Sequence, residues 1–478
     1  MDHYLNYIAD QWCDAERALT IDNPASDQPC ATVALADTHD ADRAMAAARA
    51  CVDSGALTQV RPAIRTEWLL KAAQAIRDIT EQGARLCCTE NGKRLQDARD
   101  EFSEAARYFE YYAGMADKLE GSAIPLGDEY LDFTQYLPFG VSVQIVPWNF
   151  PVSICARSLA PALAAGNAVV VKSPELSPLA MTLLIRAVVS AGFPPGAVQL
   201  LCGEGAEVGQ HLATHPQVDQ IVFTGSVATG QSILRNAAAR ATPSVMELGG
   251  KSAAVVLDDA DIDVVLESVR NGIFFNSGQV CSALSRLLVQ RSRYEEVKAA
   301  VVALAESLTT GPGDHQQSDI TPLVSRQQQQ RVLAMVDRAH AEGARLLTGG
   351  DAPELPGYFV APTVIEAEPQ MTIAQQEVFG PVLTLMPFDS EAQAIEIANG
   401  TPFGLVAGVF GQQMDRTLGV ARQLRGGQVF VNEWFAGGIE TPFGGVGLSG
   451  FGREKGQQAI YGYVHTRNIA IRLRTQPR

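Results

Sequence analysis

The sequence predicts an α/β protein built on parallel sheets, and three observations support this class. Strand-like apolar runs alternate with helical segments from Val141 to beyond Ser226. A second block of the same kind runs from Ala253 to about Gly450. The chain has 478 residues, which is too long for one ordinary domain and predicts two or three. Strand–helix units of this length place parallel strands side by side under covering helices, so doubly wound sheets are expected.

The N-terminal part is expected to hold short strands followed by three helices. Residues 1–36 read as strand pieces broken at Asn23-Pro24. The helices are predicted over Ala41–Val52, Ile64–Ile79 and Arg94–Leu119 from their helical spacing of apolar residues. Either Thr38 or Asp40 is expected to cap the first of them.

The alternating blocks begin after Gly121. Tyr130–Val146 alternates as strands do. The first block then predicts strands over Val141–Val146, Ala168–Val171, Val198–Leu201 and Gln220–Phe223, with helices from Pro151, Pro178, near Ala206 and from Ser226. The second block is expected to start just after Gly249-Gly250. The tail Tyr461–Leu473 alternates again, and this strand needs a partner edge, either Tyr130–Tyr136 or another subunit.

Composition excludes several classes of function. The net charge of −16, from 37 basic and 53 acidic residues, argues against a nucleic-acid or anionic-membrane surface. The N-terminal segment shows no secretory signal, and no apolar run is long enough to span a membrane. The 8 cysteines form no CxxC pair, so reduced thiols, a cytoplasmic location and no metal site are expected.

Cys281 is the candidate nucleophile. It follows the apolar run Ile273–Phe275 and a turn at Asn276–Gly278, which would present the thiol at the end of a helix. A free cysteine by itself is more often a small buried packing residue, so the other motifs must decide.

Two motifs at strand ends suit a nucleotide. Lys172 and Glu175 could both reach one ribose, or they could form a solvated ion pair. Gly225 and Ser226 could receive a phosphate at a helix N-terminus, or Ser226 could simply cap that helix. By contrast, Gly445–Gly450 has the G-x-G-x-x-G spacing but follows no strand, so it is interpreted as a loop.

Two further residues suit acyl chemistry. Asn149 in Pro147–Pro151 could donate its amide N–H to a developing oxyanion, or it could cap the next helix. Glu247 stands in an apolar, glycine-rich turn, where desolvation would raise its pKa and suit it as a general base. The alternative for Glu247 is an exposed carboxylate paired with Lys251.

Seven motifs, taken together and in order, resemble the aldehyde dehydrogenase superfamily: PWNFP, KSPE, FTGS, ELGGK, FFNSGQVC, EVFGPV and ETPFGG. The resemblance runs from about residue 5 to residue 473. It implies a Rossmann-like NAD-binding domain (residues 1–118 and 138–249), an α/β catalytic domain (250–450) and a small β oligomerisation domain made of a hairpin and the C-terminal strand (119–137 and 451–478). It also implies a homodimer or homotetramer.

The resemblance assigns roles to individual residues. Cys281 matches the nucleophile, Glu247 the general base and Asn149 the oxyanion donor. The residues matching cofactor contacts are Trp148, Lys172, Glu175, Gly205, Gly225, Ser226, Glu377 and Phe379. The implied cofactor is NAD, with NADP also possible, because Glu175 accepts hydrogen bonds from a ribose 2′-hydroxyl but repels a 2′-phosphate.

The implied reaction is oxidation of an aldehyde to its acid. The Cys281 thiolate attacks the aldehyde, hydride leaves for the nicotinamide, and Glu247 activates water against the thioester. A coenzyme A-acylating enzyme is one alternative, but such relatives generally lack a glutamate at the position of Glu247. A catalytically inactive structural relative is the other, but it would be expected to have lost the nucleophile or the cofactor contacts.

The sequence says less about the substrate than about the reaction and the cofactor. The resemblance places Phe150, Ile154, Arg157, Phe275 and Phe443 along the aldehyde tunnel, with Trp434 and Phe435 near its mouth. Phenylalanine walls favour a medium-sized apolar or aromatic aldehyde. Arg157 could instead grip the distal carboxylate of an acid semialdehyde such as succinic semialdehyde, or it could pair with a nearby carboxylate of the protein.

Overall fold

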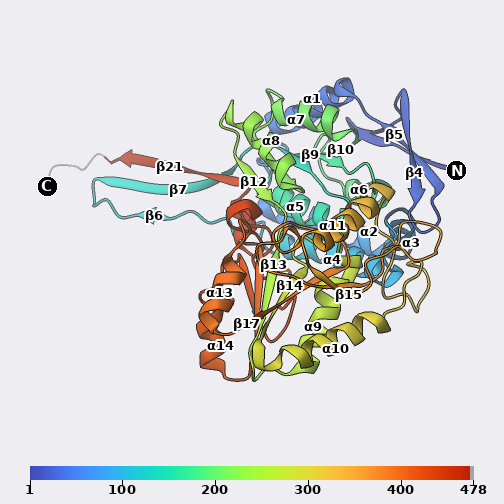
Figure 1. The fold of residues 1–478 in the computed structure, drawn as a ribbon. Helices are drawn as coiled ribbons and strands as arrows, with labels where there is room; N and C mark the ends of the chain where they lie inside the picture. Colours follow the sequence, from blue (N-terminus) through green and yellow to red (C-terminus); the bar gives the residue numbers. More distant parts are fainter. Residues whose placement is uncertain (474–478) are drawn as a thin grey trace.

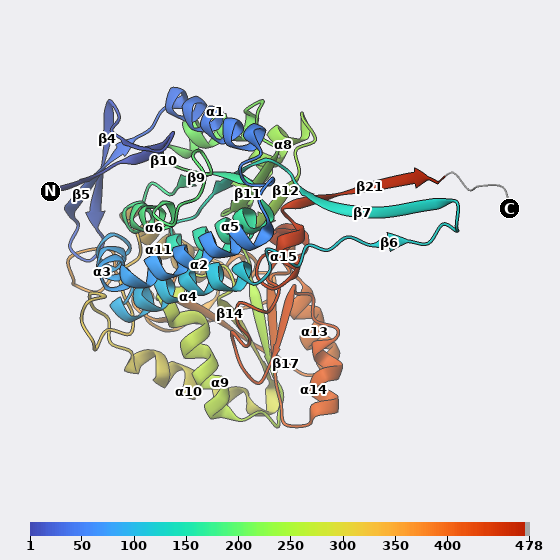
Figure 2. The same ribbon diagram turned by 180° about the vertical axis from the view of Figure 1, so that it is seen from behind.

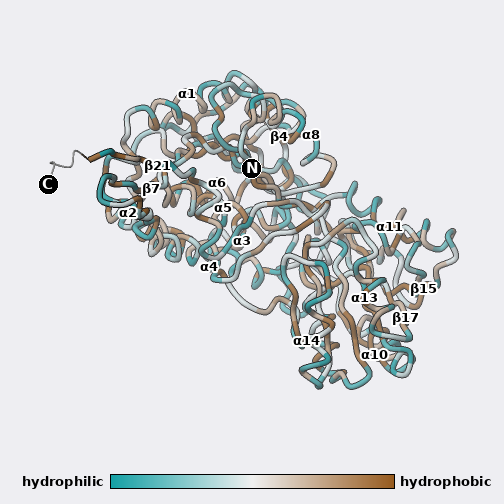
Figure 3. The backbone as a smooth tube through the Cα atoms, turned by 90° about the vertical axis from the view of Figure 1, so that its left-hand side faces the viewer, coloured by the Kyte–Doolittle hydropathy of each residue, from teal (hydrophilic) through white to brown (hydrophobic). Residues whose placement is uncertain are grey.

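The computed structural model describes residues 1–473, and the predicted α/β class is confirmed. These residues form two large sheets and two three-stranded sheets. The large sheets occupy opposite halves of the body, and a long ribbon of strands projects from its side (Figures 1 and 2). Seen from the side in Figure 3, the body has two lobes. One holds α1 (Thr38–Ser54), α2 (Pro62–Asp78) and α5 (Pro151–Ala165), and the other holds α10 (Tyr294–Ser307), α13 (Glu391–Asn399) and α14 (Met414–Ala421).

The first large sheet has the strand order β20-β12-β11-β8-β9-β10-β2-β3. Five adjacent strands are parallel: β12 (Ser244–Glu247), β11 (Gln220–Thr224), β8 (Val141–Ile145), β9 (Ala168–Ser173) and β10 (Val198–Cys202). Antiparallel strands complete both edges: β2 (Asn6–Ile8), β3 (Gln11–Cys13) and β20 (Gly450–Phe451). Because the five central strands are parallel, their carboxyl ends lie along one edge, where doubly wound sheets bind ligands.

Helices α1 (Thr38–Ser54), α5 (Pro151–Ala165), α6 (Leu179–Val189) and α8 (Val227–Ala238) pack directly on the strands of this sheet. Helices α2 (Pro62–Asp78), α3 (Thr80–Asn91) and α4 (Leu95–Ala113) form a further layer against α5 and α6, and α7 (Gln210–Thr214) packs against α1 and α8. All residues of α5 are buried, so this helix lies inside the body and not on its surface. The predicted cap of α1 was wrong. Asp37 is the cap, and it exchanges hydrogen bonds with Asp40 in a capping box.

The second large sheet has the order β15-β16-β17-β14-β13-β18-β19. Its strands are β13 (Ser252–Val256), β14 (Leu284–Gln290), β15 (Arg345–Thr348), β16 (Thr363–Glu366), β17 (Val382–Phe388), β18 (Val406–Phe410) and β19 (Gln428–Val431). Only β15 is antiparallel to its neighbour. The helices of this half are α9 (Ile262–Val269), α10 (Tyr294–Ser307), α11 (Arg326–Ala341), α12 (Thr372–Gln375), α13 (Glu391–Asn399) and α14 (Met414–Ala421). The chain passes from the first sheet to the second between Glu247 and Ser252.

The two smaller sheets lie at opposite ends of the molecule. At the N-terminal end, β5 (Gln28–Leu35) pairs with β1 (Asp2–Tyr4) and β4 (Arg17–Asn23). The other sheet, which we call the arm, consists of β6 (Ala123–Ile124), β7 (Tyr130–Pro138) and β21 (Val464–Arg472) (Figure 2). The C-terminal strand pairs with β7 along its whole length, so the chain itself supplies the partner edge. Short α15 (Gln458–Tyr461) leads into it.

Separate apolar cores stabilise the two halves. The largest surrounds the first sheet and includes α1, α2, α4 and α5. Three others lie around the second sheet, and one of them reaches Phe443 and the region of Cys281. Within residues 1–473 no helix combines the length and the apolar character needed to cross a membrane.

Candidate active site

Cys281 lies on an irregular loop between the two large sheets. After α9 the chain forms a π-helical turn (η2, Arg270–Phe274) and a short turn (η3, Phe275–Gly278) in which Asn276 and Ser277 have positive φ angles of 47° and 52°. The Ser277 hydroxyl donates to the Thr321 carbonyl at 2.7 Å and accepts from the Thr321 N–H at 2.9 Å, which fixes this strained turn. The predicted turn therefore places the thiol on a rigid loop just before β14.

Two pockets meet at Cys281 from different sides. The first has a volume of about 140 Å³ and is lined by Pro147, Trp148, Asn149, Thr224, Gly225, Ser226, Glu247, Leu248, Gly249, Cys281, Gln328, Arg331, Glu377 and Phe379. The second has a volume of about 310 Å³, and its lining includes Phe150, Ile154, Arg157, Phe275, Cys281, Phe435 and Phe443. A sulfur atom at this junction can face ligands in both pockets.

Burial controls the ionisation of the thiol. It raises the pKa of Cys281 to about 12, although the positive charge of Arg157 acts in the opposite direction. At neutral pH the resting group is therefore the thiol, and it becomes a good nucleophile only when its proton is removed.

Asn149 lies beside this loop, between β8 and α5. Its Nδ2 donates to the Gln279 carbonyl at 3.1 Å, and its side chain is buried. It does not cap α5, because the residue at the cap position is Phe150, and the first-turn N–H groups of Val152 and Ser153 donate to Glu101 and not to Asn149. The geometry thus removes the alternative interpretation of Asn149 and leaves its amide facing the Cys281 segment.

Glu247 ends β12 inside the first pocket. It is 2% exposed, and neither carboxylate oxygen has a hydrogen-bond partner among the described residues. Burial, followed by the nearby negative charge of Glu454, raises its pKa well above the ordinary range. The alternative pairing with Lys251 is not formed, because no hydrogen-bond partner of the Lys251 ammonium lies within residues 1–473.

Gly444 permits the close approach of another loop to this carboxylate. It has φ of 148°, and a Cβ atom there would lie 2.7 Å from Oε1 of Glu247. The TPFGG stretch therefore needs glycine at this point to close the pocket around Glu247.

The residues predicted to contact a ribose come together at adjacent strand ends. The ammonium of Lys172 lies 3.0 Å from Oε2 of Glu175. The N–H of Gly205, which follows β10, donates to Oε1 of the same glutamate at 2.5 Å. Glu175 is only partly buried, so its carboxylate faces the open edge of the sheet.

The glycine and serine predicted to bind a phosphate line the first pocket. Ser226 is the N-cap of α8, and its side chain accepts from the Thr229 N–H at 3.2 Å. The helix-cap interpretation is confirmed, and phosphate binding by the backbone N–H groups of the same helix end stays a prediction.

Glu377 and Phe379 form the opposite wall. The Gly250 N–H donates to Oε1 of Glu377 at 3.1 Å, and burial raises the pKa of Glu377 to about 7. The rings of Phe379 and Trp148 are perpendicular, with centroids 5.2 Å apart. Gln328 of α11 donates to the Phe379 carbonyl at 2.8 Å and fixes this turn, in which Phe379 has a positive φ of 60°.

The second pocket has aromatic walls. Phe150 and Phe275 are stacked, with centroids 5.8 Å apart and 19° between the rings. Trp434 was expected near the mouth, but it lies in the core behind the pocket, 4% exposed, and donates to the Ser282 carbonyl at 3.1 Å. Its neighbour Phe435 lines the pocket instead.

Arg157 forms a buried ion pair with Glu454, which the sequence did not single out. Burial alone would lower the pKa of Arg157, but Glu454 reverses this shift and keeps the guanidinium charged. The guanidinium also lies 5.2 Å from the centroid of the Phe443 ring. Arg157 therefore already has a protein carboxylate as its partner.

Some lining residues had no signal in the sequence. Gln328 and Arg331 reach the first pocket from α11, and Glu104 and Lys455 reach the second from α4 and from the segment after β20. None belongs to a motif. Their presence at the site could have been predicted only if the helix faces that line the pockets had been known.

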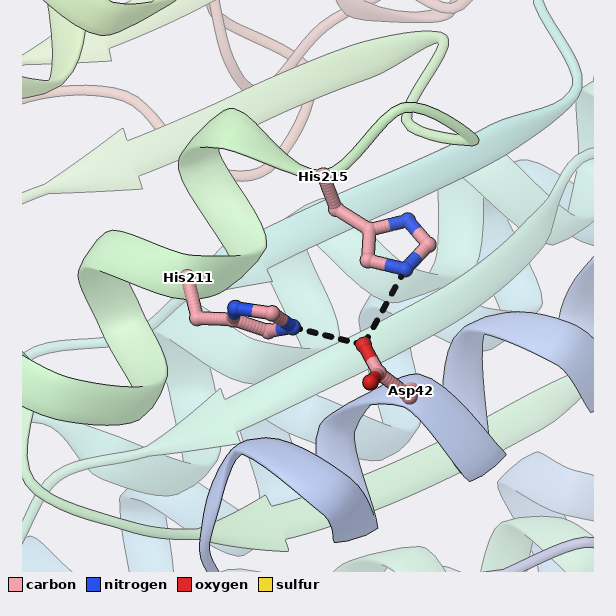
Figure 4. Close-up of side chains that lie close together, drawn as sticks. All are labelled: Asp42, His211 and His215. Atoms are coloured by element: carbon pink, nitrogen blue, oxygen red, sulfur yellow. Dashed lines mark hydrogen bonds and ion pairs between the residues drawn. The ribbon is translucent and has the colours of Figure 1, made fainter.

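A separate cluster of Asp42, His211 and His215 links α1 to α7 (Figure 4). Both imidazoles direct Nε2 toward Oδ1 of Asp42, at 2.6 and 3.3 Å. The Gln217 N–H donates to Nδ1 of His215 at 3.2 Å, so Nε2 of this ring carries the proton. Hydrogen bonds therefore account for the close approach of the three side chains.

Comparisons with known proteins show which proteins this chain is similar to. A family model described as the aldehyde dehydrogenase family matches residues 12–469. Betaine aldehyde dehydrogenase of Bacillus subtilis is 38% identical over 97% of this chain and 96% of its own length, and human retinal dehydrogenase 2 is 35% identical over 98% and 91%. The NAD+ complex structure of aldehyde dehydrogenase from Bacillus cereus superposes with a TM-score of 0.97 at 36% identity, covering 99% of this chain and 97% of that one.

Proposed function

Since this chain belongs to the aldehyde dehydrogenase family, we propose that it oxidises an aldehyde to the carboxylic acid with NAD as the acceptor. The observation that carries the proposal is the position of Cys281 at the junction of the two pockets. In this reaction one sulfur atom must reach the substrate on one side while the cofactor lies on the other.

The residues of the first pocket fit NAD. Lys172 and Glu175 would hold a ribose, the N-terminal end of α8 at Gly225 and Ser226 would receive the pyrophosphate, and Glu377, Phe379 and Trp148 would enclose the nicotinamide end. When bound, the nicotinamide supplies the hydride acceptor. Glu175 favours NAD over NADP, because its carboxylate would repel a 2′-phosphate.

Each catalytic residue has one task. The thiol proton of Cys281 passes to water, the resulting thiolate attacks the aldehyde carbon, and the Asn149 amide with the Cys281 N–H stabilises the oxyanion. After oxidation a thioester remains on Cys281. The Glu247 carboxylate takes a proton from water as the water attacks the thioester, and the acid leaves. The unpartnered Glu247 oxygens support this role over acyl transfer to coenzyme A.

We propose a medium-sized apolar or aromatic aldehyde as substrate, with an acid semialdehyde as the second candidate. The stacked Phe150 and Phe275 favour a flat or apolar group. The ion pair of Arg157 with Glu454 argues against a free clamp for a distal carboxylate. A panel of benzaldehyde, hexanal and succinic semialdehyde tests this proposal. If kcat/KM is highest for succinic semialdehyde, the acid semialdehyde becomes the first candidate.

The remaining features concern the whole chain. We propose the division into an NAD-binding domain (residues 1–118 and 138–249), a catalytic domain (250–450) and an oligomerisation domain (119–137 and 451–478). The projecting arm supports a homodimer or homotetramer. All eight cysteines are free, which supports a reducing, cytoplasmic location.

The test of function uses the wild-type protein, NAD and benzaldehyde. Reduced cofactor is followed by absorbance with and without coenzyme A. The proposal predicts turnover that does not depend on coenzyme A. A strict requirement for coenzyme A would indicate the acylating reaction, and no reduction of NAD with any aldehyde of the panel would indicate an inactive relative.

A further inference from the structure

Two side chains at the end of α3 hold the backbone of the loop between β8 and α5. They belong to Asn91, the last residue of the helix, and to Lys93, two residues later. Nδ2 of Asn91 donates to the Trp148 carbonyl at 2.7 Å. The ammonium of Lys93 donates to the Asn149 carbonyl at 2.9 Å. These are consecutive carbonyls, so their anchoring fixes the backbone from which the Trp148 ring and the Asn149 amide project.

Lys93 is fully buried and paired with Glu101 of α4, whose side chain is 2% exposed. Oε1 of Glu101 accepts the N–H groups of Val152 and Ser153, in the first turn of α5, at 2.8 and 3.0 Å. Between them, Lys93 and Glu101 therefore hold both the Asn149 carbonyl and the start of the next helix.

The Lys93 ammonium also lies 4.3 Å from the centroid of the Phe150 ring, a cation–π contact with a wall of the second pocket. Burial alone would lower the pKa of Lys93, but the Glu101 carboxylate reverses this and raises it. A charged, fully satisfied pair is therefore present next to the site, although neither partner lines either of its two pockets.

The same carbonyl connects Lys93 with the nucleophile loop. Nδ2 of Asn276, five residues before Cys281, lies 3.3 Å from the Asn149 carbonyl. The Asn149 amide in turn donates to Gln279 of that loop. A shift of the Asn149 backbone would therefore change the position of its amide relative to Cys281.

We propose that Lys93, acting with Glu101, is a positioning residue that sets the Asn149 amide in place beside Cys281. It acts through the Asn149 backbone and not on the substrate. The inference rests on the proposed role of Asn149 as the oxyanion donor.

The test compares Lys93→Met with the double variant Lys93→Met/Glu101→Gln. Methionine keeps the apolar stem but removes the donor and the charge, and glutamine removes the carboxylate that would otherwise be left unpaired. We expect kcat to fall about 10- to 100-fold in both, the scale at which misplacing a catalytic group acts, while KM for NAD stays unchanged. The double variant should regain much of the lost Tm without regaining kcat, and Lys93→Arg should regain part of kcat.

Arg65→Met is the matched control. Arg65 is a buried cation that donates to the Ala164 carbonyl at 2.9 Å, at the opposite end of α5. We expect it to lower Tm and to leave kcat unchanged. Wild-type kcat in the double variant, or the same change of kcat in Arg65→Met, would overturn the inference.

Asn149→Ala, measured in parallel, separates this inference from the proposed function. If Asn149→Ala loses kcat but the Lys93 variants do not, only the positioning role fails. If Asn149→Ala keeps wild-type kcat, the proposed oxyanion role fails, and the inference fails with it.

Discussion

At the scale of single residues, the site depends on the partly buried Cys281 and the buried Glu247, and each must lose a proton before it can act. The pKa values of both Cys281 and Glu247 are raised by burial. Only the carboxylate form of Glu247 can accept a proton from water, so the fraction of active base increases as the pH rises through its raised pKa.

Deacylation should therefore accelerate with increasing pH. We expect hydrolysis of the Cys281 thioester, formed with p-nitrophenyl acetate, to quicken from acidic through neutral to alkaline pH in the wild type. In Glu247→Gln the hydrolysis of the thioester should be slower. The increase of its rate with pH that titration of Glu247 causes should be lost. The same pH profile in both proteins would contradict the assignment of Glu247 as base.

The pair of Arg157 and Glu454 leads to a prediction about stability. Arg157→Leu leaves a buried carboxylate without its partner, which typically costs about 3–5 kcal/mol. We expect a large fall in the free energy of unfolding by urea, partly restored in Arg157→Leu/Glu454→Gln. Arg291→Leu, which breaks an exposed pair with Asp389, is the control and should have little effect.

The substrate panel decides between the two roles of Arg157. If the residue is structural, Arg157→Leu should change kcat/KM for benzaldehyde and succinic semialdehyde in parallel. A selective loss for succinic semialdehyde would show that Arg157 binds a carboxylate of the substrate.

The residues that could be predicted from sequence are those at strand ends within motifs. Asn149, Glu247 and Cys281 belong to segments whose local pattern indicates a strand, a turn or a helix start. Glu454 and Lys93 could not be predicted, because their contacts with Arg157 and with the Asn149 carbonyl join segments far apart in the sequence, and neither sequence context is unusual. Trp434 was misplaced because an aromatic residue in a loop has the same local pattern whether its ring faces the pocket or the core.

At the scale of elements, the strand order brings together the residues that we propose to bind the cofactor. Because β11, β8, β9 and β10 are adjacent and parallel, the residues that follow them share one edge. The alternating pattern predicted these strands closely, but it could not predict that β20 returns from the far end of the chain to pair with β12. Such long-range pairing depends on tertiary contacts and leaves no local periodicity.

The N-terminal end of α8 gives a prediction with a close control. Ser226→Ala removes a cap, as does Ser390→Ala at α13, where the side chain accepts from the Gln393 N–H. Each should cost about 1 kcal/mol of stability. Only Ser226→Ala should weaken NAD binding, measured by fluorescence titration, and equal affinities in the two variants would remove Ser226 from the cofactor site.

At the scale of the whole molecule, the arm is the feature that one chain does not explain. Large apolar side chains of the arm and of the segment that joins β6 to β7 are 39–50% exposed: Ile124, Leu126, Leu131 and Ile471. Exposed apolar surface on a projecting sheet indicates a partner. The sequence predicted an edge strand here, but not that the edge would stand away from the body.

We therefore expect light scattering to give a dimer or a tetramer at micromolar concentration. Leu131→Asp/Ile471→Asp should shift the protein toward smaller species. Met414→Asp, on the exposed part of α14, is the control and should leave the assembly unchanged. A wild-type protein with the mass of one chain would contradict this prediction.

We propose above all that Cys281 carries the acyl group and that Glu247 releases it. The most direct measurement is rapid-mixing absorbance of reduced cofactor in Glu247→Gln, with Cys281→Ala as the control. We predict a burst equal to the concentration of active sites followed by slow turnover in Glu247→Gln, together with an acyl adduct on Cys281 in the mass spectrum, and no burst in Cys281→Ala. Normal turnover in either variant would contradict the account.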